Sequence, residues 1–148
     1  MTTQRVTLTR NVLIGVAVAI MIFGAVQVSA TVVQADPSID SFWGKFKVAV
    51  IKGDKESIAT MSQFPITMPY GIPSVRRKVE LLKRYREVFS DQTNAAKCFA
   101  ESKPEVDPAD KNHFTVACKD AGGSEVVMYG FVRSRGVWKL RFLDNIAE

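Results

Sequence analysis

Three aspartates and three tyrosines are the residues of this chain that could carry out acid–base chemistry together. An isomerase-type reaction needs a carboxylate base in an apolar pocket and a hydroxyl that donates a hydrogen bond to the developing oxyanion. The candidate bases are Asp54, Asp91 and Asp144, and the candidate donors are Tyr70, Tyr85 and Tyr129. No two of these residues stand at a spacing typical of a known catalytic motif.

Most of these six residues also have a structural explanation. Asp54 and Asp91 occur where helix caps and turns favour aspartate. Tyr85 falls on the apolar face of a predicted helix, and Tyr129 falls in an alternating strand. Asp144 follows the last predicted strand and is expected at the surface. The sequence therefore favours structural roles, and we assign no catalytic residue.

The two cysteines, Cys98 and Cys118, could form a disulfide, remain free thiols or supply half of a metal site. The single histidine, His113, leaves too few ligands for tetrahedral zinc, so we expect no metal and no cofactor. An exported chain with an even number of cysteines favours the disulfide. Closing such a loop should contribute about 3 kcal/mol to stability.

Export is indicated by the N-terminus. Arg5 and Arg10 precede an uninterrupted apolar run over residues 12–26. This order is typical of a signal peptide. The run is short for a membrane-spanning helix, which needs about 20 apolar residues. The sequence therefore predicts a removable signal peptide over residues 1–35 and a periplasmic or secreted protein that does not associate with the membrane after cleavage.

Two cleavage sites are compatible with the small residues that follow the apolar run. Cleavage after Ala35 leaves Asp36 and Pro37 at the new terminus, and cleavage after Ala30 is the alternative. A second alternative is an uncleaved anchor that holds the same domain at the outer face of the inner membrane. In each case the domain lies outside the cytoplasm.

Residues 36–148 have the size of a single domain with one core. Removing Arg5 and Arg10 lowers the formal net charge of +5 by two. The remaining mild excess of positive charge does not indicate a nucleic-acid partner, and export argues further against one.

Three helices are predicted in the first half of this domain, over residues 41–52, 55–63 and 75–89. Gly53 ends the first helix and Asp54 caps the second. In the third, apolar residues recur at the helical period, which is typical of a helix packed on a core.

An apolar segment separates the second helix from the third. Residues 64–73, here called the rim segment, contain three prolines and a glycine and must be extended or turning. The segment presents Met68, Tyr70 and Ile72. It either covers the open end of the fold or forms the rim of a binding site.

The second half of the domain changes to a period of two. The predicted strands cover residues 95–101, 113–119, 125–132 and 137–143, and they form a four-stranded antiparallel meander. In the last strand Trp138, Leu140 and Phe142 alternate with Lys139 and Arg141, so the three apolar residues should face the helices. Pairing the first two strands would bring Cys98 beside Cys118 in a cross-strand disulfide.

Helices followed by a curved antiparallel sheet resemble the α+β cone of the nuclear transport factor 2-like, or cystatin-like, superfamily. The segments that carry a narrower resemblance to uncharacterised exported bacterial members are Phe42 to Phe46, Gln63 to Gly71, Arg84 to Phe89, and Asp144-Asn145. The resemblance implies a conical pocket between sheet and helices. Some members use that pocket for isomerase or dehydratase chemistry and others only for binding or dimerisation, so the fold leaves the function open.

The sequence therefore predicts an α+β domain with N-terminal helices packed on a curved four-stranded antiparallel sheet, after a signal peptide. Our hypothesis is a non-enzymatic module that binds a small apolar ligand or a protein partner. The predicted contact residues are Met68, Tyr70, Ile72, Tyr85 and Tyr129.

Two alternatives remain. The first is an isomerase- or lyase-like enzyme with a buried Asp/Tyr pair in the cone. The second is a homodimer formed through the exposed sheet face. Lys139 and Arg141 lie on that face, and their charges argue against such an interface.

Overall fold

The structure is a computed structural model that describes residues 38–69, 71–120 and 122–147. The predicted signal peptide over residues 1–35 and the candidate residue Tyr70 lie outside the described residues. None of the helices in the described part is long and apolar enough to span a bilayer.

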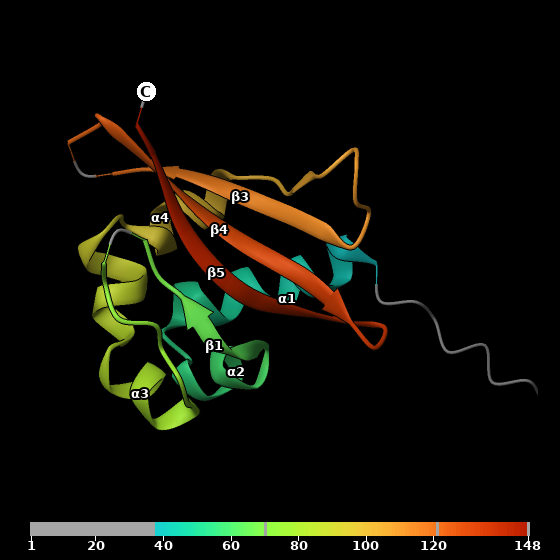
Figure 1. The fold of residues 1–148 in the computed structure, drawn as a ribbon, viewed down its shortest axis with the longest axis horizontal. Coiled ribbons are helices and arrows are strands. Elements are labelled where there is room, and N and C mark those ends of the chain that lie inside the picture. The colour runs from blue at the N-terminus through green and yellow to red at the C-terminus, as the bar shows by residue number, and fades with distance from the viewer. Residues whose placement is uncertain (1–37, 70, 121, 148) are drawn as a thin grey trace, which may run out of the picture. The chain divides into compact units, whose positions relative to one another are not determined.

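The described chain has the predicted α+β architecture, with helices on one side of a curved sheet (Figure 1). The elements are α1 (Ile39–Lys52), α2 (Lys55–Thr60), β1 (Ser62–Thr67), α3 (Lys78–Lys83), the π-helix η1 (Glu87–Asp91), α4 (Ala95–Glu101), β2 (Glu105–Val106), β3 (His113–Lys119), β4 (Glu125–Ser134) and β5 (Val137–Ala147). The strand order is β1-β5-β4-β3-β2. The sheet therefore has five strands, where four were predicted, and β1 lies parallel to β5.

The helix α1 begins and ends as its sequence predicts. The Ser38 side chain accepts a hydrogen bond from Ser41 N at 3.1 Å, which satisfies one of the free N–H groups of the first turn. Gly53 ends the helix at φ 67°, a left-handed conformation that glycine adopts without steric cost. The buried face consists of Phe42, Trp43, Phe46, Ala49 and Val50.

The second predicted helix is too long at its C-terminal end. Asp54 caps α2 as expected, but the helix ends at Thr60, and Ser62 already belongs to β1. The first part of the rim segment is consequently an edge strand, where proline is tolerated because its missing N–H would face away from the sheet. The Phe64–Pro65 peptide bond is cis.

The third predicted helix, over residues 75–89, is interrupted. Within it, α3 and the residues from Tyr85 to the end of η1 are helical, and Val75 instead forms an antiparallel bridge with Ile66. Val79, one of the apolar residues at the helical spacing, is 47% exposed in α3, whereas Leu81, Val88 and Phe89 are buried.

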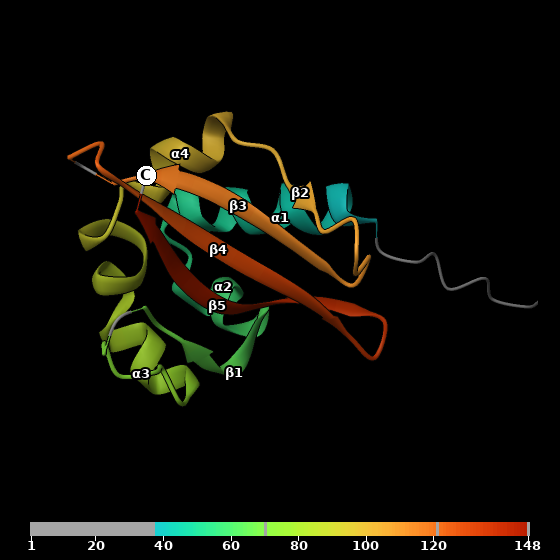
Figure 2. The same cartoon turned by 45° about the horizontal axis from the view of Figure 1, so that its top comes forward.

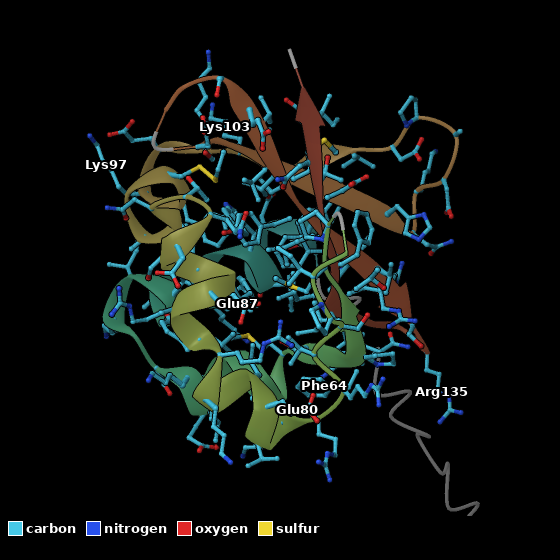
Figure 3. All side chains as sticks on the ribbon, turned by 60° about the vertical axis from the view of Figure 1, so that its left-hand side comes forward. Phe64, Glu80, Glu87, Lys97, Lys103 and Arg135 are labelled. Atoms are coloured by element: carbon cyan, nitrogen blue, oxygen red, sulfur yellow. A yellow bond between two sulfur atoms is a disulfide. The ribbon has the colours of Figure 1, made fainter. Side chains whose placement is uncertain are left out.

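The prediction of a strand over residues 95–101 is wrong, because this stretch is the helix α4. Asn94 caps it by accepting a hydrogen bond from Lys97 N at 3.0 Å. Cys98 and Cys118 form the predicted disulfide, with a Cα–Cα distance of 5.8 Å, but it joins α4 to β3 rather than two strands (Figure 3). Thr93, just before α4, donates to Lys119 O at 2.6 Å and fixes the same junction.

The strands β3, β4 and β5 confirm the predicted meander, with β4 and β5 longer than expected. The additional strand β2 lies in the stretch between residues 101 and 113, where no strand was predicted. A bulge lies near the middle of the β4–β5 pair: Phe131 pairs with Leu140 but Gly130 pairs with Phe142, which leaves Arg141 as the extra residue.

The bulge reverses the predicted orientation of one aromatic residue. A one-residue shift moves every following side chain to the opposite face of a strand. Trp138 and Leu140 face the helices as predicted. Beyond the bulge Leu143 takes the buried position, and Phe142 lies on the other face, which we call the outer face.

Candidate functional site

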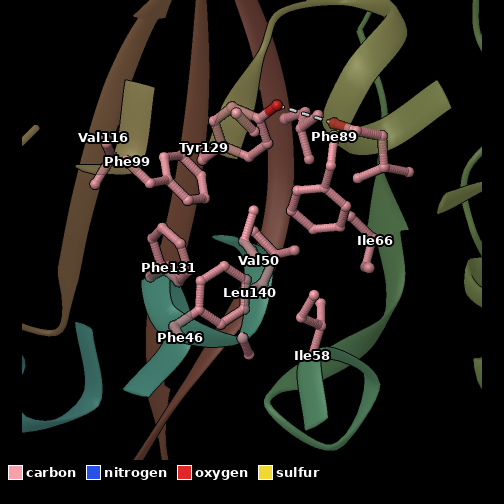
Figure 4. Packing of buried hydrophobic residues seen from close by; sticks show 14 of the residues in the cluster. Phe46, Val50, Ile58, Ile66, Phe89, Phe99, Val116, Tyr129, Phe131 and Leu140 are labelled. Carbon is pink, nitrogen blue, oxygen red and sulfur yellow. Dashed lines mark hydrogen bonds between the residues drawn. The ribbon is translucent and has the colours of Figure 1, made fainter. Parts of the chain in front are cut away.

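Aromatic side chains fill the interior between the helices and the sheet (Figure 4). Phe46 of α1 meets Phe131 of β4 edge to face, with ring centroids 5.0 Å apart, and Phe99 of α4 meets Tyr129 in the same way at 4.9 Å. These four side chains are fully buried. The position of the expected conical pocket is thus occupied by the protein's own core.

Tyr129 is part of this core. Its hydroxyl donates a hydrogen bond to Val88 O in η1 at 2.9 Å, and its ring stacks on Phe89 at 5.8 Å (Figure 4). Burial raises the pKa of the phenol well above its usual value, because the phenolate would lose its hydration. The hydroxyl therefore holds a carbonyl of the π-helix in place.

Tyr85 also contacts Phe89. Its ring lies 5.0 Å from Phe89, and its hydroxyl donates to Val50 O near the end of α1 at 3.3 Å. Lys55 Nζ lies 5.2 Å from the centre of the ring. Partial burial raises the pKa of Tyr85. The structure thus brings Tyr85 and Tyr129 together around Phe89, and both hydroxyls are bound to backbone carbonyls.

The three candidate bases do not join these tyrosines. Asp54 caps α2, where hydrogen bonds from the Ser57 hydroxyl and backbone N–H lower the pKa of its carboxyl. Asp91 is exposed beside Arg86. Asp144 is exposed on β5. An acid–base pair of the isomerase type is therefore not assembled from the residues that the sequence singled out and the structure describes.

The outer face of the sheet carries a groove that the rim segment helps to form. Its volume is about 520 Å³, and Met68 of the rim segment lines it together with Arg141 and Phe142 of β5. The Arg141 guanidinium donates a hydrogen bond to Pro65 O, which ties β5 to β1. Ile72, the third predicted rim residue, packs partly buried against the core and is not part of this groove.

A second groove of about 390 Å³ lies beside the first and includes Met128 and Thr115. Phe142 and His113 line both grooves and form the ridge between them. His113, the first residue of β3, is half exposed, and its Nδ1 lies 2.9 Å from Asp110 Oδ2. Within the described residues no group of three potential metal ligands is close enough to bind an ion.

Phe142 is the site residue that sequence reasoning missed. Its ring lies directly on Gly130 of β4, at a position where a Cβ atom would overlap the ring. A glycine between two buried aromatics, Tyr129 and Phe131, was the available signal, because glycine in a strand often marks a close approach of another group.

Substituting alanine for Gly130 should displace the Phe142 ring and reduce the free energy of unfolding by about 1–3 kcal/mol, the usual cost of overpacking. Urea denaturation measures this change. In a Phe142→Ala background the same substitution should be neutral or stabilising, because the ring is gone. Equal costs in both backgrounds would contradict this contact.

No protein-family profile and no curated protein matches the chain. Among solved structures, it is similar to a hexachlorocyclohexane dehydrochlorinase, LinA type 2, with 13% identity over 74% of this chain and 82% of that chain and a TM-score of 0.44. A domain of unknown function with a cystatin-like fold from Nostoc punctiforme shows 12% identity, 76% coverage of both chains and a TM-score of 0.44.

A third similar structure is a putative dehydratase of the nuclear transport factor 2-like family from Streptomyces avermitilis. It has 16% identity over 72% of this chain and 91% of that chain, with a TM-score of 0.42. These structures belong to the fold that the sequence pattern resembles. At such identities the likeness concerns the arrangement of elements, and the activities of those proteins are not carried over to this chain.

Proposed function

We propose that this chain is an exported, non-enzymatic binding module that engages a protein partner through the outer face of its sheet. The contrast between the two faces carries this proposal. Core aromatics occupy the inner face, whereas the outer face offers two adjoining grooves with a half-buried aromatic residue, Phe142, between them. The Cys98–Cys118 disulfide and the N-terminal apolar run support export.

A protein partner fits this surface better than a small molecule. Small-molecule sites enclose most of their ligand in a concave pocket. Here two grooves lie side by side over β2, β3, β4, β5 and the rim segment. Apolar residues such as Val106 and Ile146 remain 46% and 48% exposed. A surface with aromatic and methionine side chains and a polar margin is typical of a protein interface.

Site-specific photocrosslinking in the cell envelope tests this function. A photoreactive phenylalanine analogue in place of Met128, in the second groove, should yield one defined crosslinked species whose partner is identified by mass spectrometry. The matched control carries the same analogue in place of Val48, a 43% exposed residue on α1. The control should give no such species.

The outcomes distinguish the alternatives. A product containing two copies of this chain would identify the partner as a second copy and would favour the homodimer. Identical products from the Met128 and Val48 positions would show that the outer face has no special role. Absence of any product at Met128, and at Val132 on the same face, would contradict the proposed function.

A further inference from the structure

Trp43 carries a buried hydrogen-bond donor that lacks an acceptor among the described residues. Trp43 is 4% exposed, and its indole Nε1 has no hydrogen-bond partner and less than 1 Å² of accessible surface. The ring is held by Phe46, Phe99 and Phe131. Buried indole N–H groups normally find a partner, so this donor requires an explanation.

The same tryptophan lines a groove of about 690 Å³ between α1 and the chain that leads into β2. Lys47 contributes from α1, and Lys103 contributes from the opposite wall. The segment that carries Lys103 runs beside the first half of α1 (Figure 2), and Lys103 itself is labelled in Figure 3. This groove is distinct from the two on the outer face, although Val106 borders both regions.

The charge of the groove favours an anion. Lys47 and Lys103 form no ion pair with any acid in the described part of the chain. Asp40 is the one acidic residue lining the groove, and it lies in the first turn of α1, where the helix dipole stabilises a carboxylate. The groove therefore has two ammonium groups and one carboxylate, and the helix dipole already stabilises that carboxylate.

The remaining walls are apolar. Ile39 and Pro104 line the groove, and Val106 leaves 46% of its surface in water. A ligand suited to these walls has an apolar body, and its polar end must accept hydrogen bonds from the indole and attract the two lysines. A carboxylate has both properties, because it is negatively charged and accepts hydrogen bonds through both oxygens.

We propose that this groove binds a carboxylate attached to an apolar group, with one carboxylate oxygen accepting the Trp43 indole hydrogen bond between Lys47 and Lys103. The ligand oxygen reaches Nε1 when the wall formed by Ser102 to Val106 moves outward. The two ends of that wall are fixed, because Ser102 N donates to Cys98 O and Asp107 N donates to His113 O. Between them it pairs with β3 only through Glu105 and Val106, both of which are exposed.

Proton–nitrogen NMR tests this site. The sample is the ¹⁵N-labelled protein as it is purified from the cell, with its disulfide intact. The chain has two tryptophans and therefore two indole signals, and Trp43→Phe identifies that of Trp43 by its disappearance. Sodium octanoate should shift the Trp43 indole proton downfield and saturably. The backbone amide of Val106 should shift over the same concentration range, because the wall moves with binding.

Matched variants test the role of the lysines. Lys47→Gln and Lys103→Gln should each weaken octanoate binding roughly two- to fivefold, as expected for partly exposed ion pairs. The control is Lys97→Gln. Lys97 is exposed on α4 and lies outside this groove, so this substitution should leave binding unchanged. Trp43→Phe keeps the aromatic packing and removes the donor, and it should weaken binding about fivefold, followed through the Val106 amide.

Neutral and peptide probes define the ligand class. 1-Octanol, which has the chain without the charge, should leave the indole signal unchanged. An acetylated alanyl-leucine dipeptide with a free C-terminal carboxylate should shift the signal. The same dipeptide with an amidated C-terminus should not. Tighter binding of the dipeptide would identify peptide C-termini as the source, and tighter binding of octanoate would identify free fatty acids.

Two results would overturn the proposal. The first is a Trp43 indole signal that stays in place at saturating octanoate and dipeptide. The second is a shift that octanol produces equally well, or that the lysine variants leave unchanged, since neither would involve recognition of a carboxylate.

Discussion

The Phe131→Ala variant should lose about 3–5 kcal/mol of unfolding free energy, the usual range for truncating a buried phenylalanine. Phe131 is fully buried and contacts Phe42, Trp43 and Phe46 of α1 and Phe114 of β3. Its ring therefore joins the first helix to the centre of the sheet. Urea denaturation followed by far-ultraviolet circular dichroism measures the loss.

A milder substitution at the same position is the control. Phe131→Leu keeps most of the apolar volume and should cost less than about half as much as the alanine variant. Should Phe131→Ala cost under about 1 kcal/mol, the interior would not be packed as described. The case for a filled cone, and with it the case against an internal ligand, would then fail.

Replacing Cys98 and Cys118 together by alanine should lower the free energy of unfolding by about 3 kcal/mol, because the unfolded chain regains the freedom that the crosslink removes. The bond spans a sequence separation of 20 residues and joins α4 to β3. Alanine is preferred to serine because Cys118 is 1% exposed, and a hydroxyl there would be buried. Thermal and urea unfolding both measure the effect.

A reductant provides the comparison for the double variant. Dithiothreitol should lower the stability of the original chain towards that of the variant and should leave the variant unchanged. Equal stability of the oxidised and reduced protein would contradict this prediction. It would mean that the bond does not stabilise the fold by constraining the unfolded chain.

Local signals along the chain predicted much of the fold. Ser38, Asp54 and Gly53 act at the ends of α1 and α2 as their residue types suggest. The alternation in residues 113–119 is the strand β3 with the predicted bounds. In these segments the side-chain pattern and the backbone propensity agree, and such agreement makes a local prediction reliable.

The errors arose where a local pattern could be satisfied in more than one way. Residues 95–101 contain alanines and follow Asn94, a good helix cap, yet placing Cys98 beside Cys118 was equally compatible with a strand. In the third helix, α-helix begins only at Lys78, Val75 instead pairs with Ile66, and the chain passes into a π-helix at residues 87–91. Interruptions of this kind depend on tertiary packing and leave no clear periodicity in the sequence.

The candidate site was predicted only in part. Met68 lines the first outer-face groove but is only 6% exposed and belongs to the core, and Tyr85 and Tyr129 serve the interior. Phe142 was assigned to the wrong face because alternation was continued through the bulge at Arg141. The position of a bulge depends on how two distant strands pair, which a period-two pattern in one strand does not specify.

Beyond the two residue pairs that β3 forms with β2, α4 lies against the edge of β3. An open strand edge with unbonded carbonyls is a template on which other chains can polymerise. Here Lys119 O accepts a hydrogen bond from Thr93 Oγ1 beside α4, and the sulfur of Cys98, which has no proton to donate, lies 3.5 Å from Ala117 O. Farther along the same edge, His113 O accepts a hydrogen bond from the backbone N–H of Asp107, which follows β2. Because the crosslink joins α4 to β3, reducing it should leave this edge open to pairing with other chains, in addition to lowering the stability of the fold.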